Sequence, residues 1–299
     1  RGSDKVVQAI QGADLQVRAG ETLGLVGESG SGKTTVGRCL MRLETPTAGE
    51  IRFEGVDIAS LPPADLRRLR SKLQIILQDP YDSVHPRWTL EKTLSEPLRA
   101  HQHLSRKAER ARCEALMEMV GLDPADLSRR PRGLGSGALQ RLSIARALAT
   151  EPKFVVLDEP TSVLAPAAVT GLIELLRRLQ AELGLGFLFI SHDLTTVEHL
   201  CHRVAVMYLG QIVEVGDVGQ VFDAPRHPYS TCPPAATSRA AAPSRWRPAQ
   251  APPRSSKPSK TAARSAACAW RRESWHDLLR RLPGARRRRR RHHRRGRFG

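Results

Sequence analysis

Short apolar runs alternate with stretches of helical spacing along most of the chain. Apolar or alternating runs bounded by turn residues are typical of strands, and apolar positions three to four apart are typical of helices. In the N-terminal part, this pattern predicts strands over residues 6–17, 21–26, 49–58 and 73–77, and a helix over residues 34–43. We therefore expect an α/β core with a peripheral antiparallel β region.

The middle of the sequence has a different character. From about residue 80 to residue 135 it is charged and compatible with helices. Ser105 is a suitable N-cap for a helix over residues 106–120, on which Leu116, Met119 and Val120 share one side. We predict a helical subdomain inserted at about residues 80–135.

The rhythm of strands and helices then resumes. Strands are expected over residues 154–157, 186–190 and 204–208, and helices over residues 138–149, 169–183 and 194–200. Short apolar strands that alternate with helices predict a mostly parallel sheet covered on both faces.

This pattern ends after Tyr229. Residues 231–299 are rich in Ala, Pro, Ser and Arg and lack apolar periodicity, apart from residues 275–282, which are compatible with a short helix. We therefore predict a globular domain over residues 1–230 and a disordered tail over residues 231–299.

The charge of the chain is concentrated in that tail. Of 48 Lys and Arg residues, 20 lie in residues 231–299, whereas of 30 Asp and Glu residues only Glu273 and Asp277 lie there. Residues 1–230 thus hold 28 basic and 28 acidic residues, and the formal charge of +18 belongs to the tail. The globular part itself is neutral.

The cysteines and the hydropathy of the chain bear on its cellular compartment and on whether it spans a membrane. The five scattered cysteines have neither zinc-site spacing nor the density of a disulfide scaffold, so we expect reduced thiols in the cytosol. No run approaches the roughly 18–20 apolar residues of a membrane-spanning helix, and no leader opens the chain. Because the sequence begins at Arg1, close to a strand-like stretch, we expect that the natural N-terminus is missing.

A glycine-rich loop carries the clearest chemistry. It lies between a predicted strand and a predicted helix, matches G-x-x-x-x-G-K-[ST], and consists of Gly27, Glu28, Ser29, Gly30, Ser31, Gly32, Lys33 and Thr34, with Thr35 following. The N–H groups of such a loop point at phosphate oxygens, while Lys33 reaches the β and γ phosphates and Thr34 offers a hydroxyl to Mg²⁺. A Gly/Ser linker is the alternative, but linkers seldom join an apolar strand to a helix and end in Lys-Thr. The loop predicts binding of ATP and Mg²⁺.

Two carboxylates after a buried strand complete this interpretation. Asp158 and Glu159 follow the apolar residues 154–157. Asp158 would hold Mg²⁺ through water, and Glu159 would orient or deprotonate the attacking water. An exposed acidic turn is the alternative, and the phosphate loop makes it the weaker one.

The order of further motifs resembles the ABC ATPases over about residues 5–230. These motifs are Gln78 after an apolar strand, the run 140–148 (QRLSIARAL), residues 158–162 (DEPTS) and residues 191–193 (SHD). The resemblance implies a P-loop NTPase fold, in which Gln78 couples the nucleotide and its metal to the helical region, and His192 contacts the γ-phosphate beside Glu159. A P-loop kinase would not explain Gln78 or residues 191–193.

Further residues resemble one subfamily, the dipeptide/oligopeptide (peptide/nickel) importer ATPases. They are residues 78–81 (QDPY), 85–87 (HPR) with Thr89, 96–98 (EPL), 206–210 (VMYLG) and 225–229 (PRHPY). The resemblance implies a second ATPase subunit, two membrane permeases and, indirectly, a substrate-binding protein. The chain would then lie peripherally on the cytoplasmic face of the inner membrane.

The sequence departs from the family at the signature motif. The family reads Leu-Ser-Gly-Gly-Gln where this chain has Leu134, Gly135, Ser136, Gly137 and Ala138. In the family this loop caps the ATP of the opposite subunit, so Gly135, Ser136 and Gly137 would contact the partner's nucleotide.

Two other departures point the same way. Ala165 replaces an expected aspartate, and no aromatic residue before Phe53 is available to stack on adenine. We expect weak closure over the partner's ATP, impaired activity as a homodimer, and a heterodimer as the working pair.

The basic tail leaves two interpretations open. It is either a polybasic arm that binds nucleic acid or anionic lipid, or the product of an altered reading frame in a GC-rich gene. The abrupt break after residue 229 favours the second, so we do not expect nucleic acid as a partner. A soluble ABC ATPase, or a catalytically impaired regulatory subunit with a nucleic-acid-binding tail, is the rival function.

Overall fold

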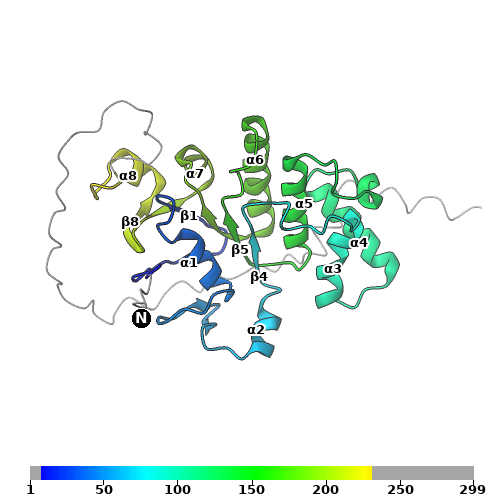
Figure 1. The fold of residues 1–299 in the computed structure, drawn as a ribbon, viewed down its shortest axis with the longest axis horizontal. Coiled ribbons are helices and arrows are strands. Elements are labelled where there is room, and N and C mark those ends of the chain that lie inside the picture. Colours follow the sequence, from blue (N-terminus) through cyan, green and yellow to red (C-terminus); the bar gives the residue numbers. More distant parts are fainter. Residues whose placement is uncertain (1–7, 231–299) are drawn as a thin grey trace, which may run out of the picture. The chain divides into compact units, whose positions relative to one another are not determined.

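The computed structural model describes residues 8–230, which contain a six-stranded sheet with helices on both faces (Figure 1). The strand order is β4-β5-β6-β1-β7-β8. All neighbouring strands are parallel except β7 and β8, which form an antiparallel pair at one edge. The strands are β1 (Thr22–Val26), β4 (Leu73–Ile76), β5 (Phe154–Asp158), β6 (Gly186–Ile190), β7 (Arg203–Tyr208) and β8 (Gln211–Asp217).

The two faces of the sheet pack against different helices. Leu23 and Leu25 of β1 belong to the core that includes Val36 of α1 (Lys33–Leu40). Gly24 points the other way, where an added Cβ would lie 3.0 Å from Val197 in α7 (Leu194–Leu200). Helices α5 (Ser136–Leu148) and α6 (Pro166–Leu183) also contribute leucines to this second face, next to Phe187. Because both faces are covered, the central strands are mostly apolar.

A group of helices lies beyond the β4 edge of the sheet (Figure 1). It consists of α3 (Leu90–His101), α4 (Arg106–Met119) and the 3-10 helix η1 (Pro124–Ser128), which pack on one another and on α5. Thr89 and Ser105 cap α3 and α4 through their side-chain oxygens. The predicted helix after Ser105 is therefore confirmed.

Smaller elements lie at the periphery. β2 (Arg52–Phe53) and β3 (Val56–Asp57) form an antiparallel hairpin, whose turn residues Glu54 and Gly55 have positive φ. Helix α2 (Pro63–Leu69) follows this hairpin, and α8 (Val218–Asp223) packs beside β8. The hairpin matches the strand and turn expected over residues 49–58, whereas α2 was not predicted.

The prediction of a strand over residues 6–17 is wrong for the residues that the structure describes. Residues 8–17 contain no strand, although Gln11 donates one backbone hydrogen bond to Gly210. The apolar pattern has another cause, because Ile10, Leu15 and Val17 pack against the core from outside the sheet. Both sides of β1 are already taken by β6 and β7, so no edge is free there.

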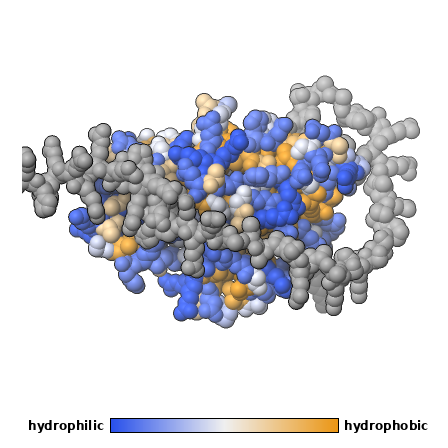
Figure 2. Space-filling model, turned by 180° about the vertical axis from the view of Figure 1, so that it is seen from behind, coloured by the Kyte–Doolittle hydropathy of each residue, from blue (hydrophilic) through white to orange (hydrophobic). Residues whose placement is uncertain are grey.

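Residues 1–7 and 231–299 lie outside the described part of the chain, and so does the helix expected at residues 275–282. Within residues 8–230, no helix is long and apolar enough to span a membrane. The visible surface of that part is mostly hydrophilic, with separate hydrophobic patches (Figure 2).

Candidate functional site

The phosphate loop connects β1 to α1, as the sequence predicted, and two of its glycines are required by close backbone contacts. Gly27 has a φ of 155°, and a Cβ there would lie 2.1 Å from the carbonyl oxygen of Met207. At Gly32, with a φ of 105°, a Cβ would lie 2.4 Å from the carbonyl oxygen of Ala9. Only glycine fits both positions, so the loop is pressed directly against β7 and the N-terminal segment.

The ammonium group of Lys33 lies inside this loop. Its Nζ donates hydrogen bonds to the carbonyl oxygens of Gly27 (2.8 Å) and Glu28 (2.7 Å). Burial lowers the pKa of Lys33, and the carboxylates of Glu159 and Asp158 only partly offset this effect. The loop therefore holds a buried cation that its neighbouring carboxylates only partly compensate, which favours an anionic ligand.

A hydrogen bond joins the side chains of Thr34 and Asp158. Asp158 ends β5, and its Oδ1 accepts a hydrogen bond of 3.1 Å from the hydroxyl of Thr34 at the start of α1. Burial raises the pKa of Asp158 despite this hydrogen bond. A carboxylate with this environment gains from a nearby cation.

Gln78, Glu159 and His192 come together although they are far apart in the sequence. They follow β4, β5 and β6, which are adjacent parallel strands, so their carboxyl ends share one edge. Nε2 of Gln78 lies 3.1 Å from one carboxylate oxygen of Glu159, and Nδ1 of His192 lies 3.3 Å from the other. Both oxygens of Glu159 are thus engaged.

Local backbone structure orients two of these side chains. Glu159 has a φ of 47°, in the left-handed region that non-glycine residues seldom adopt. His192 lies in a tight turn, where the N–H of Asp193 binds Ser191 Oγ (3.0 Å) and Asp193 caps α7. Strain of this kind is common where a side chain is held for a task.

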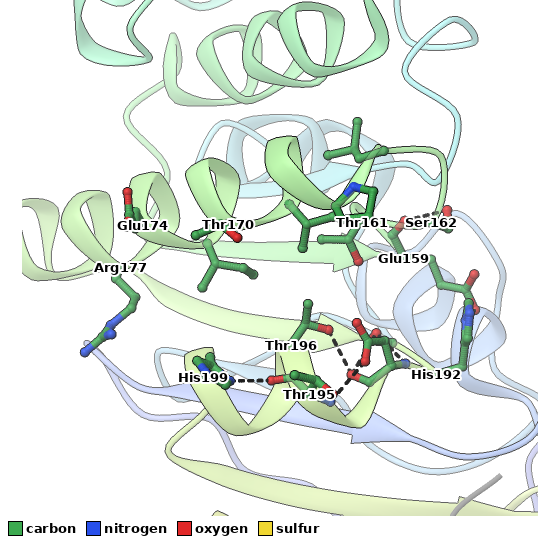
Figure 3. A pocket seen from close by; sticks show the side chains of 16 residues that line it. Glu159, Thr161, Ser162, Thr170, Glu174, Arg177, His192, Thr195, Thr196 and His199 are labelled. Carbon is green, nitrogen blue, oxygen red and sulfur yellow. Dashed lines mark hydrogen bonds and ion pairs between the residues drawn. The ribbon is translucent and has the colours of Figure 1, made fainter. Parts of the chain in front are cut away.

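A groove of about 540 Å³ runs between α6 and α7 from this point (Figure 3). Glu159 and His192 lie at one end of it, and Glu174 and Arg177 at the other. Its walls combine apolar side chains of α6 with the hydroxyls of Thr195 and Thr196. The catalytic candidates are therefore reached from an open surface and are not enclosed in a cavity.

The residues of the loop fit a nucleotide phosphate. Ser31 Oγ is buried and has no hydrogen-bond partner among residues 8–230, as expected of a group that awaits a ligand. Within the same residues, no group of three His, Cys, Asp or Glu side chains could hold a metal ion by itself. Mg²⁺ is commonly held by one or two protein groups together with substrate phosphates and water, and Thr34 and Asp158 offer two such groups side by side. The metal-binding role of Thr34, Gln78 and Asp158 stays a prediction.

The signature residues are not part of this cluster. No hydrogen bond in the described part of the chain joins Gly135, Ser136 or Gly137 to the phosphate loop. Gly135 is the N-cap residue of α5 and, as a glycine, has no side chain that could supply a capping hydrogen bond. The predicted contact of these residues with a nucleotide requires a second subunit and stays a prediction.

One contact was missed by the sequence analysis. The backbone N–H of Glu28, in the phosphate loop, donates a hydrogen bond of 3.2 Å to the hydroxyl of Tyr229. The two residues are 201 positions apart, and no periodicity relates them.

The phosphate loop follows β1, and the two acidic residues lie at the end of β5, two strands away in the sheet. This arrangement defines a P-loop nucleoside triphosphatase. Sequence comparison makes the class specific, because the profile of the ABC transporter family matches residues 10–162. The chain belongs to the ABC transporter family.

Several curated proteins are similar over most of the described chain. A putative oligopeptide transport ATP-binding protein, YkfD of Bacillus subtilis, is 44% identical over 230 residues, which are 77% of this chain and 70% of that protein. The glutathione import ATP-binding protein GsiA of Escherichia coli K12 is 48% identical over 81% of this chain, but the match spans only 39% of GsiA. A probable peptide ABC transporter ATP-binding protein of Sinorhizobium fredii, y4tS, is 45% identical over 75% of this chain and 64% of its own length.

Solved structures agree with this assignment. The ABC transporter cassette MJ0796, in a dimeric post-hydrolysis state with ADP and Pi, has a TM-score of 0.66 at 25% identity, over 73% of this chain and 94% of MJ0796. CbiO1 from Clostridium perfringens has the same TM-score at 28% identity, over 72% of this chain and 84% of its own. The expected α/β P-loop NTPase fold of ABC ATPases is confirmed.

Replacing Lys33 with an uncharged side chain tests the phosphate loop. Lys33→Met should abolish the rise in Tm that ATP and Mg²⁺ produce, because the phosphates lose their buried cation. It should change the Tm of the nucleotide-free protein little, because removal of a charge that burial disfavours is opposed by loss of the hydrogen bonds to Gly27 and Glu28. Thermal unfolding with and without ATP measures both effects, with Lys107→Met, at an exposed position of α4, as the control. A nucleotide-induced shift that persists in Lys33→Met would contradict this assignment.

A second variant tests the burial of Asp158. Because the pKa of Asp158 is raised in the folded protein, the cost of its ionisation is absent below the unfolded pKa and appears as pH rises through the folded pKa. Asp158→Asn avoids that cost and still offers Thr34 an acceptor. The variant should therefore have the higher Tm at pH 7 without nucleotide, and the difference should shrink toward pH 4. A Tm difference that does not change with pH would argue against this explanation.

Proposed function

We propose that this chain is the ATP-binding and ATP-hydrolysing subunit of an ABC importer that takes up peptides or similar small solutes. The observation that carries the proposal is the meeting of Gln78, Glu159 and His192 beside the phosphate loop. The names of YkfD, GsiA and y4tS, which refer to oligopeptides, glutathione and peptides, support the class of solute.

Each residue of the site has a role in phosphoryl transfer. Lys33, Ser31 and the backbone N–H groups of residues 27–35 would hold the phosphates, and Thr34 and Asp158 would hold Mg²⁺ with Gln78. The metal, when bound, would neutralise charge on the phosphates. Glu159 would take a proton from the attacking water, and His192 would contact the γ-phosphate.

The contacts of Glu159 suggest how hydrolysis is suppressed when no nucleotide is bound. Gln78 donates a hydrogen bond to one of its oxygens and His192 lies 3.3 Å from the other, so both side chains would compete with an attacking water for this carboxylate. Release of either partner toward the nucleotide would expose the base. The two residues thus connect nucleotide binding to catalysis.

The assembly would be heteromeric. MJ0796 forms a dimer, and we infer that this chain pairs with a second ABC ATPase and binds two permeases at the cytoplasmic face of the membrane. A substrate-binding protein would deliver the solute to the permeases.

The backbone at Gly135 bears on whether this chain could carry the family's signature residue there. Gly135 and Ala165 are the N-cap residues of α5 and α6, and neither supplies a side-chain capping hydrogen bond; those of α1, α2 and α8 supply none either. Gly135 has a φ of −68° and a ψ of 158°, which a serine adopts without strain. The family's serine would therefore fit this backbone at position 135.

Co-purification tests the proposed assembly. A tagged chain, extracted from native membranes with mild detergent, should bring down two permeases and a second ABC ATPase. The competing function is a regulatory ABC protein whose tail binds nucleic acid. It predicts recovery without permeases and salt-sensitive nucleic-acid binding that disappears when residues 231–299 are deleted.

Restoring the signature tests the proposed asymmetry. The triple variant Gly135→Ser, Ser136→Gly, Ala138→Gln should raise ATP turnover of the isolated chain by about 10- to 100-fold, the effect of one regained hydrogen bond to a charged group. The same triple variant combined with Lys33→Met serves as a background control and should stay inactive. Turnover of the unaltered chain that already equals that of an intact importer pair would refute the idea.

A further inference from the structure

The last described residues of the chain fold back onto the phosphate loop. Residues 224–230, which we call the C-terminal segment, follow α8 and are anchored on β8 by Glu214. Its two carboxylate oxygens accept hydrogen bonds from the backbone N–H groups of Arg226 (2.9 Å) and His227 (3.1 Å). The segment is therefore held on the sheet before it reaches Tyr229.

Tyr229 is then oriented by its ring and its backbone. Its ring lies against that of Tyr208, at the end of β7, with centroids 4.4 Å apart and planes inclined by 38°. Its backbone N–H donates a hydrogen bond of 3.2 Å to Nδ1 of His227. Burial, together with the nearby carboxylate of Glu28, raises the pKa of Tyr229, so its hydroxyl is protonated at neutral pH.

The hydroxyl of Tyr229 ends at the backbone of the phosphate loop. It accepts a hydrogen bond of 3.2 Å from the N–H of Glu28, the first residue after Gly27. On the same side of the loop, the N–H of Gly210 donates a hydrogen bond of 2.9 Å to the carbonyl oxygen of Ser31. Gly27 itself is in close contact with Met207. The loop is thus supported by β7, by the β7–β8 turn and by Tyr229.

This support matters because a phosphate loop binds through the direction of its N–H groups. A loop that is already fixed loses less conformational freedom when a phosphate binds, and so binds it more tightly. Among these supports, the contact of Tyr229 is the one made by a side-chain hydroxyl, and it can be removed without changing the backbone. We propose that Tyr229 is a positioning residue for ATP, which acts through the backbone of Glu28 and makes nucleotide affinity depend on the C-terminal segment.

The proposal rests on the proposed function, since it assumes that the loop binds ATP. It predicts an effect on affinity and not on the chemical step, because among the described residues no hydrogen bond or ion pair joins Tyr229 to Glu159 or His192. Loss of one neutral hydrogen bond corresponds to about a two- to tenfold change in an equilibrium constant.

The test compares Tyr229→Phe with Tyr81→Phe in the full chain. Tyr81→Phe is the same chemical change at a side chain that is 57% exposed. In the nucleotide-free protein, amide hydrogen exchange of peptides that contain Glu28 should be faster in Tyr229→Phe and unchanged in Tyr81→Phe. With ATP and Mg²⁺, Kd and KM should rise about two- to tenfold in Tyr229→Phe, while kcat stays the same.

Tyr229→Ala separates positioning from packing. It removes the ring contact with Tyr208 as well as the hydroxyl, so it should lower Tm in addition to affinity. If only Tyr229→Ala has an effect, and Tyr229→Phe equals the unaltered chain in exchange and in Kd, Tyr229 is a packing residue and the proposal is wrong. A chain that binds no ATP at all would overturn the proposed function, and this inference with it, whatever the exchange data show.

Discussion

Parallel pairing of β4, β5, β6 and β1 is the constraint on which the rest of the structure depends. It brings the carboxyl ends of four strands to one edge of the sheet, and a site residue follows each of them. Gln78, Glu159 and His192 come after three neighbouring strands, and the phosphate loop comes after the fourth. Apolar side chains on both faces of the sheet stabilise this pairing. Core residues that lie away from the site therefore fix the distances within it.

In the protein without a ligand, the buried charges of the site are only partly compensated by their neighbours. Burial shifts the pKa of Lys33 downward and that of Asp158 upward, so each side chain is pushed toward its neutral form. Opposite charges close to each group would reverse these shifts. A magnesium–triphosphate complex would supply both at once, with negative oxygens for the lysine and a cation for the aspartate. Binding of this ligand would therefore offset the unfavourable burial of Lys33 and Asp158 in the folded protein.

Local signals made most of the fold and site predictable. The phosphate loop is contiguous, and the strand with Asp158 combines four apolar residues with two acids, so both were found in the sequence. The prediction of a strand over residues 6–17 was wrong, because an alternating apolar pattern indicates that side chains are buried but not that the backbone pairs with another strand. Contacts that join distant segments left no local pattern, and Tyr229 on Glu28 is the clearest case. The role of Gly135 stays a prediction, because it concerns contact with a nucleotide in a second subunit.

The place of β1 in the sheet has a consequence for biosynthesis. This strand is made early, yet it lies between β6 and β7, which end at Ile190 and Tyr208. Its hydrogen-bonding partners do not exist until the ribosome has passed those residues. At roughly 5–20 residues per second, the nascent chain must wait on the order of ten seconds or more with its first strand unpaired. The exposed apolar strand TLGLV is then a target for chaperones or aggregation, and formation of the nucleotide site marks one of the last steps of folding.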